Sequence, residues 1–226
     1  MTMTILTLDI ETRPCDDPAL IEEIISLVRP PRTITRTESI AAWWKENGEA
    51  AKQEAIARTS FDGTYGRICC IGYAFDDSPA EAHCGEEDIV IRKFFFDVTE
   101  AAMVKHYDAP VKVHTIVGHN VSAFDLRFLW QRAVILGIPR PQSIPWQAKP
   151  WELQDTMVMW NPDREKRISL DRLCKVLDIK SPKGDLDGSK IAQAWADGRH
   201  DDIAHYCKAD VDATRACWQK LTSSSA

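Results

Sequence analysis

The chain has 226 residues, of which 44% are hydrophobic and 27% are charged, and its formal net charge is −6 at pH 7. This length suits one large domain, and the acidic balance argues against a nonspecific nucleic-acid coat protein, which would be strongly basic. No apolar run reaches the roughly 20 residues that cross a bilayer, and the N-terminus lacks the basic start and uninterrupted apolar stretch of a secretion signal. The seven cysteines include no C-x-x-C spacing, so we expect a cytoplasmic protein with no membrane association and with reduced thiols.

The first predicted element is a strand over residues 4–10, in which apolar and other residues alternate. Because side chains alternate between the two faces of a strand, Asp9 and Glu11 point to the same face where this strand ends. A helix over residues 19–28 follows. Residues 29–60 are then predicted to form an insertion-like helical segment between the first two strands.

The helix of this insertion has predicted boundaries of its own. It would open with a capping box from Thr35 to Glu38 and be interrupted near residues 47–48, which read Asn-Gly. We expect Trp43 and Trp44 to pack into the core, and a lid or a DNA-guiding role is the alternative for the segment.

The rest of the chain combines short strands with longer helices. Strands are predicted over residues 67–75, 81–84 and 113–117, and helices over residues 86–106, 123–136, 170–177, 189–196 and 202–221. Strands that cluster early and helices that dominate later are typical of an α/β domain with a mixed sheet flanked by helices. We therefore expect a single domain over residues 1–222, followed by a frayed tail over residues 223–226.

Three short stretches carry acidic residues in patterns that are informative as a set. They are Asp9-Ile-Glu11, then GHNVSAFDLRFL around Asp125, then HYCKADVDAT with Tyr206 and Asp210 one helical turn apart. Paired carboxylates repel one another unless a divalent cation neutralises them. If the strand end and the two helix faces converge, they form a two-cation site that can activate water and stabilise the leaving oxygen of a phosphodiester.

Each stretch also has a structural interpretation that involves no ligand. The strand end would be solvated, Ser122 and Asp125 would form a capping box, and the third stretch would be an exposed polar stripe. A fourth acid, Asp155, lies in an apolar setting after a proline-rich connector, and we expect it to be structural rather than a ligand. Residues 164–190 hold eight Lys/Arg against five Asp/Glu, which indicates either a solvated face or a phosphate contact.

The order D-x-E, N-x-x-x-F-D and Y-x-x-x-D resembles the DEDD superfamily of 3′–5′ exonucleases, in its tyrosine branch (DEDDy). The stretches LDIETRP and GHNVSAFDLRFL are similar to the exonuclease domain of family B DNA polymerases, and DLDGSKIAQAWADGRHDDIAHYCKADVDATRACW resembles the stand-alone exonucleases related to that domain. The three motifs span residues 9–210, nearly the whole chain. The resemblance implies a ribonuclease H-like fold.

By position, the resemblance also implies roles for individual residues. Asp9 would bridge two Mg²⁺ or Mn²⁺ ions, and Glu11, Asp125 and Asp210 would complete the set of protein ligands. Tyr206 would orient the attacking water. The resemblance further implies substrate contacts from Thr12, Asn120, Phe124 and Lys183.

His205 introduces an ambiguity, because its spacing of five residues to Asp210 matches the histidine branch of the superfamily. At about 100° per residue, a helix places Tyr206 about 40° from Asp210 and His205 about 140° away. We therefore predict that Tyr206 shares the acidic face of the helix and that His205 does not.

The resemblance implies release of nucleoside 5′-monophosphates from the 3′ end of DNA, which we expect to be single-stranded. An exoribonuclease is the alternative within the enzyme class, because the motifs do not read the 2′-hydroxyl. Outside that class, the chain could be a catalytically silent nucleic-acid-binding or regulatory module, or a structural protein whose acids are all solvated. Since no polymerase domain accompanies the motifs, proofreading would require a polymerase or repair partner in trans, and the sequence does not specify an oligomeric state.

Overall fold

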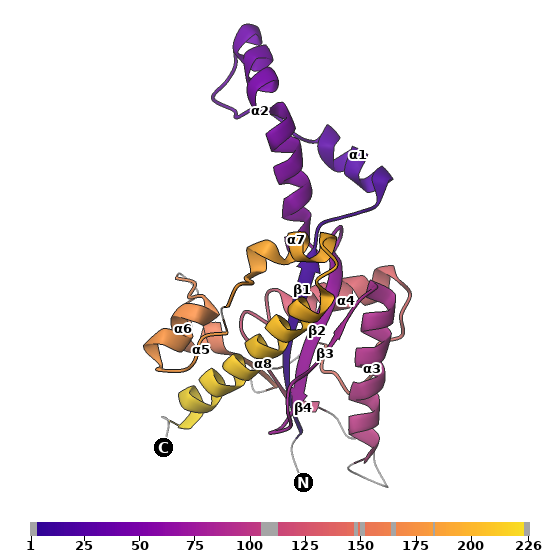
Figure 1. The fold of residues 1–226 in the computed structure, drawn as a ribbon, viewed down its shortest axis with the longest axis vertical. Coiled ribbons are helices and arrows are strands. Elements are labelled where there is room, and N and C mark those ends of the chain that lie inside the picture. Colours follow the sequence, from indigo (N-terminus) through magenta and orange to yellow (C-terminus); the bar gives the residue numbers. More distant parts are fainter. Residues whose placement is uncertain are drawn as a thin grey trace.

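The structure is a computed structural model that describes residues 4–104, 113–146, 149, 152–163, 166–182 and 184–223. Its centre is a five-stranded sheet with the strand order β3-β2-β1-β4-β5 (Figure 1). The strands are β1 (Thr4–Arg13), β2 (Arg67–Phe75), β3 (Glu81–Cys84), β4 (Val113–Gly118) and β5 (Leu153–Asp155). Strands β1, β2 and β3 are antiparallel neighbours, whereas β4 and β5 run parallel to β1. The prediction of a mixed sheet flanked by helices in a ribonuclease H-like arrangement is confirmed.

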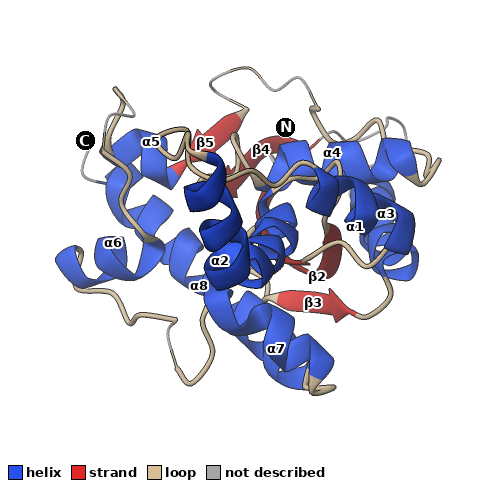
Figure 2. Cartoon of the chain, turned by 90° about the horizontal axis from the view of Figure 1, so that it is seen from above, coloured by secondary structure: helices blue, strands red, loops and turns tan. Residues whose placement is uncertain are grey.

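Helices pack on both faces of this sheet (Figure 2). The helices of the described residues are α1 (Pro18–Ser26), α2 (Thr37–Arg58), α3 (Glu87–Val104), α4 (Asp125–Ile135), α5 (Thr156–Trp160), α6 (Leu170–Val176), α7 (Ile191–Ala196) and α8 (His200–Ser223), with 3-10 turns η1 (Thr59–Phe61) and η2 (Gly188–Lys190). The alternate residues Leu6, Leu8 and Ile10 of β1 are buried in the cluster that includes α3 and α4. The opposite face of β1 therefore turns towards α8, which contacts both β1 and β2.

The long helix α8 approaches the sheet closely at Gly72, which pairs with Asp9 across β1 and β2. A Cβ atom at this position would lie 2.8 Å from the Cys207 Sγ and 3.0 Å from the Cys207 carbonyl oxygen. Glycine therefore lets α8 settle onto the strand pair beside Asp9.

Replacing Gly72 by alanine is expected to lower the free energy of unfolding by about 1–3 kcal/mol, because the added methyl group overpacks this contact. Urea unfolding followed by circular dichroism measures the change. Gly188→Ala is the matched control, since a Cβ there would have no heavy atom within 4 Å. Equal stability of the two variants would contradict the close packing.

The chain between β1 and β2 extends away from the sheet as α1 and then α2, the helix of the predicted insertion over residues 29–60, and the two helices contact one another (Figure 1). Two predictions for the insertion are wrong. α2 is one unbroken helix of 22 residues, and it passes through Gly48 because the absent side chain leaves room for the Trp44 ring one turn earlier. The helix also begins with Arg36 as its N-cap, one residue later than the predicted capping box requires, and no side chain caps it.

The two tryptophans of α2 are not core residues, so that prediction is also wrong. Trp43 and Trp44 are partly exposed and stack edge to face on one another, with ring centres 5.1 Å apart. Gly48 is the single buried residue of α2, and the buried clusters among the described residues do not include either ring. The reason is the direction of α2, which extends away from the sheet (Figure 1).

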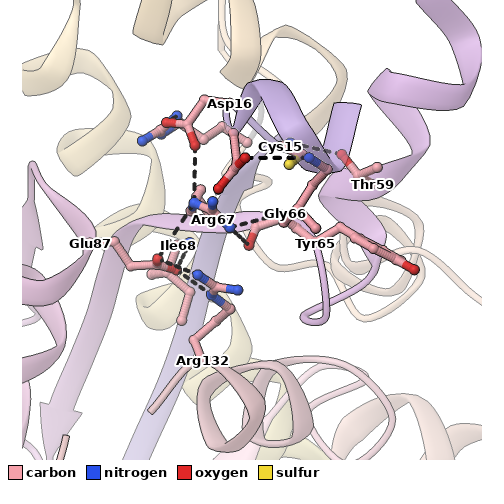
Figure 3. A network of polar contacts seen from close by, with 12 residues as sticks. Cys15, Asp16, Thr59, Tyr65, Gly66, Arg67, Ile68, Glu87 and Arg132 are labelled. Carbon is pink, nitrogen blue, oxygen red and sulfur yellow. Dashed lines mark hydrogen bonds and ion pairs between the residues drawn. The ribbon is translucent and has the colours of Figure 1, made fainter. Parts of the chain in front are cut away.

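A buried ion pair joins β2, α3 and α4 (Figure 3). Two nitrogens of Arg132 donate to the two carboxylate oxygens of Glu87, each over 2.9 Å, and the backbone N–H of Ile68 donates to the same carboxylate over 2.8 Å. Arg67 lies beside this pair and forms an ion pair of 3.0 Å with Asp16, which follows β1. Local sequence patterns did not predict this network.

All seven cysteines are free, as predicted, and none of the described helices is both long enough and apolar enough to span a membrane. Helix α8 continues to Ser223, and the remainder of the expected tail, like residues 105–106 of the expected third helix, lies outside the described residues.

Candidate active site

The acids of the first and third sequence motifs meet where α8 crosses β1. Ligand atoms of Asp9, Glu11 and Cys207 all lie within 4.8 Å of one another. Asp210 follows one turn later on α8, and it is the largest charged influence on the pKa values of both Asp9 and Glu11. Glu11 and Asp210 are each 8% exposed, so these charges are held in a largely buried place.

The acid of the second motif is fixed to the same strand. Asp125 is the first residue of α4 and is 3% exposed. Its Oδ1 accepts a hydrogen bond of 3.0 Å from the backbone N–H of Ile10, the residue between Asp9 and Glu11. Four carboxylates from β1, α4 and α8 are therefore brought together.

The capping box between Ser122 and Asp125, the alternative interpretation of this stretch without a ligand, does not form. Helix α4 begins at Asp125 itself, with Phe124 as a cap residue that makes no side-chain hydrogen bond. The Ser122 hydroxyl instead donates to Asp155 over 2.7 Å, and the Asp125 carboxylate faces β1. Because α4 begins later than the capping box requires, the Asp125 carboxylate lies with the other acids rather than in a capping hydrogen bond with Ser122.

Burial and mutual repulsion raise the pKa values of the clustered acids. For Asp9, burial is the largest cause and Asp210, Glu11 and Asp125 add to it. For Glu11, burial is followed by Asp210 and Asp125. Burial raises the pKa of Asp125 to about 7, although two backbone hydrogen bonds oppose the shift. The ionised cluster is therefore unfavourable unless positive charge is added to it.

These shifts predict how stability depends on pH in metal-free buffer. Because an acid with a raised pKa binds its proton more tightly in the folded chain than in the unfolded chain, stability falls as pH rises from about 4 through about 7. Urea unfolding at pH 5 and pH 8 in EDTA should show the lower midpoint at pH 8. Asp125→Asn should flatten this dependence, and a wild-type midpoint that rises over this range would refute the assignment.

Tyr206 and His205 occupy different faces of α8. The Tyr206 hydroxyl bonds Asp210, and burial together with Asp210, Glu11 and Asp9 raises the pKa of this phenol above its ordinary value. His205 is exposed. Tyr206 therefore shares the acidic face and keeps its proton at physiological pH.

Asp155 holds the loop that precedes α4. Its carboxylate accepts hydrogen bonds from the backbone N–H of Asn120 (2.9 Å) and from the backbone N–H of Ser122 (3.1 Å), and it also caps α5. Asn120 has a positive φ of 64°, a left-handed conformation that asparagine tolerates better than most residues. Asp155 therefore has the structural role that the sequence predicted.

The predicted substrate-contact residues lie at different places around the acids. Phe124 is partly buried and its ring centre is 5.5 Å from that of Phe128. Thr12 follows Glu11 at a break in the β1–β2 register, and its hydroxyl donates to the Ser60 carbonyl oxygen over 2.7 Å. Lys183 lies outside the described residues, so its contact with a phosphate stays a prediction.

Cys207 is a site residue that sequence reasoning missed. It is fully buried, and its thiol lies 3.5 Å from the Asp9 Oδ2, to which it donates. Burial raises the pKa of this thiol well above its ordinary range, so it stays protonated beside the acids. The signal was its position three residues before Asp210, which places both on one helix face.

A family model matches residues 81–225, and its description is "Predicted 3'-5' exonuclease related to the exonuclease domain of PolB". The chain belongs to this family. The matched region contains the second and third motifs, whereas Asp9 and Glu11 precede it. The protein is thus a predicted 3′–5′ exonuclease, an enzyme class that acts on nucleic acid.

Comparison with solved structures finds the same fold in the family B DNA polymerase from the hyperthermophilic archaeon Pyrobaculum calidifontis. The TM-score is 0.58 and the sequence identity 19%, over 98% of this chain and 25% of the polymerase chain. This chain therefore corresponds to about a quarter of that polymerase. Among curated proteins, no sequence matches.

Proposed function

We propose that this exonuclease releases nucleoside 5′-monophosphates from the 3′ end of single-stranded DNA. In this proposal, Asp9, Glu11, Asp125 and Asp210 hold two divalent cations, Mg²⁺ or Mn²⁺. The observation that carries the proposal is the convergence of these four carboxylates, whose burial and repulsion raise the pKa values of three of them. Membership of the exonuclease family supports it independently.

The donor set fits hard cations. Carboxylate oxygens are the ligands that Mg²⁺ and Mn²⁺ prefer, and a few protein carboxylates suffice because water and substrate oxygens complete the coordination. The neighbouring Cys207 thiol stays protonated and so does not compete as a thiolate ligand. When bound, such cations supply an activated water and stabilise the leaving oxygen of the phosphodiester.

The chain's own groups would orient the reactants. The protonated Tyr206 hydroxyl suits a hydrogen bond that positions the attacking water, rather than removal of its proton. Asn120 and Phe124 lie in or beside the loop that Asp155 holds, next to the acidic cluster, and we assign them to the terminal nucleotide. The backbone at Thr12, at the register break after the strand acids, would contact the same nucleotide.

Digestion of 5′-labelled single-stranded DNA and RNA of one sequence tests the proposal. With Mg²⁺ or Mn²⁺, the DNA should shorten from its 3′ end as a ladder, and EDTA should stop the reaction. A strand blocked by a 3′-phosphate serves as the control for direction. Internal cleavage, or faster digestion of RNA than of DNA, would contradict the proposal as stated.

Substituting Tyr206 by phenylalanine is expected to lower kcat by about tenfold to a hundredfold, with a smaller change in KM, because the hydroxyl acts on the attacking water. His205→Gln is the matched control on the exposed face of the same helix and should retain the wild-type kcat. A larger loss in the His205 variant would assign the chain to the histidine branch instead.

A further inference from the structure

A concave feature lies between α4, the connector before β5, and β5 itself. It is a cleft of about 760 Å³. Arg127 and Trp130 line it from α4, Arg140 and Trp146 line it from the connector, and Ser122 lies at its rim. None of the described residues that line the cleft is acidic.

Arginine and tryptophan are interleaved in this cleft. The Arg140 guanidinium carbon lies 5.4 Å from the centre of the Trp130 ring and 5.7 Å from that of Trp146. Trp130 is 42% exposed, and Arg127 and Arg140 are also exposed. Open aromatic faces beside cations are the features with which proteins bind single strands, since bases stack on the rings and phosphates meet the cations.

The cleft adjoins the loop that precedes Asp125, because Ser122 of this loop lines it. Asp125 begins α4, and Trp130 follows five residues later, about 7.5 Å along the helix axis and about 140° around it, so that Trp130 faces the cleft while Asp125 faces β1. Ser122 joins the two regions, because it lines the cleft and also belongs to the loop that Asp155 fixes before Asp125. Because Asn120 and Phe124 of the same loop are assigned to the terminal nucleotide, the preceding nucleotides can continue past Ser122 into the cleft.

Charge also favours a single-stranded nucleic acid as the occupant of the cleft. The chain has a formal net charge of −6, which disfavours approach of a polyanion to most of its surface. A lining with two arginines and no acid among its described residues is complementary to phosphate against that background.

We propose that this cleft binds the single-stranded DNA immediately upstream of the 3′-terminal nucleotide. A base stacks on the open face of Trp130, and Arg127 and Arg140 contact phosphates. The inference rests on the proposed function, because it takes the acidic cluster to be the place where the 3′ end lies.

Binding and turnover are measured separately to test the inference. Fluorescein-labelled dT10 is titrated with full-length protein in EDTA and followed by fluorescence anisotropy. Trp130→Ala should weaken binding by about tenfold, as loss of a stacked base predicts. Arg140→Ala should reduce the slope of log K against log salt by about 0.7, as loss of one phosphate contact on a single strand predicts. Trp160→Ala is the matched control, because Trp160 is 41% exposed and lies on α5 outside the cleft.

For turnover, the measured quantity is the ratio of kcat/KM for dT10 to kcat/KM for the p-nitrophenyl ester of thymidine 5′-monophosphate, which has no upstream nucleotide. Trp130→Ala should lower this ratio by about tenfold. Equal dT10 affinity in the Trp130 and Trp160 variants, or an unchanged ratio in the Trp130 variant, would overturn the inference. If the wild-type protein bound dT10 through Trp130 but hydrolysed neither substrate, the cleft would stand as a strand-binding site and the proposed function would fail.

Discussion

The Asp9→Asn protein is expected to lose exonuclease activity while becoming more stable in metal-free buffer. Activity should fall by more than the roughly 10²–10⁴-fold that one general base supplies, because Asp9 is a proposed cation ligand and the other three acids all act on it. Stability should rise at pH 8 in EDTA, because the amide removes a carboxylate whose pKa is raised by burial and by three other acids.

The opposite signs separate a cation site from a structural acid. A carboxylate that stabilises the fold through hydrogen bonds would lose stability on conversion to asparagine. Asp212→Asn is the matched control, because Asp212 is exposed on α8 only two residues from Asp210 and pairs with Arg215. Digestion of labelled DNA and urea unfolding in EDTA measure the two effects. An Asp9 variant that is as active as the Asp212 variant, or less stable than wild type, would refute the proposed role.

The Arg132→Met protein is expected to lose about 3–5 kcal/mol of stability, the largest loss that we predict for a single substitution. Arg132 is 2% exposed and Glu87 is 6% exposed, so the substitution leaves a buried carboxylate without its bidentate partner. The pair joins the start of α3 to α4, whose first residue is Asp125. We therefore expect a weaker hold on Asp125 as well as a lower unfolding midpoint.

The control for this prediction is Arg58→Met, which removes an exposed ion pair with Glu54 on α2 and should change stability by less than about 1 kcal/mol. Glu87→Gln combined with Arg132→Met should recover part of the loss, because the unpaired charge is then absent. Urea unfolding of the wild-type protein, the two single variants and the double variant measures the changes in the free energy of unfolding. Similar losses for the Arg58 and Arg132 variants would show that burial of the pair is unimportant.

Parts of the site that depend on local periodicity could be predicted from the sequence. Alternation along β1 places Asp9 and Glu11 on one face, and helical spacing on α8 places Tyr206 near Asp210. These relations involve residues within one element, so the sequence spacing determines them. The mixed sheet was predicted separately, from the order of strands and helices along the chain.

Parts that depend on contacts between distant elements could not be predicted in this way. Asp125 accepts its hydrogen bond from Ile10, 115 residues away, whereas the capping box offered a partner only three residues away. The Cys207 thiol contacts Asp9 because Gly72 allows α8 to approach the sheet. The spacing within α8 places Cys207 and Asp210 on one face, but it does not indicate this approach. For both Asp125 and Cys207, packing between elements that are distant in the sequence determines the contact.

The most direct test of the central claim is calorimetric titration of Mn²⁺ into the wild-type and Asp9→Asn proteins in two buffers of different ionisation enthalpy. We expect the wild-type protein to bind Mn²⁺ and to release protons, since acids with raised pKa values must ionise to become ligands. We expect the Asp9 variant to bind more weakly and to release fewer protons. Absence of Mn²⁺ binding by the wild-type protein, or equal binding by both proteins, would contradict a cation site at the acidic cluster.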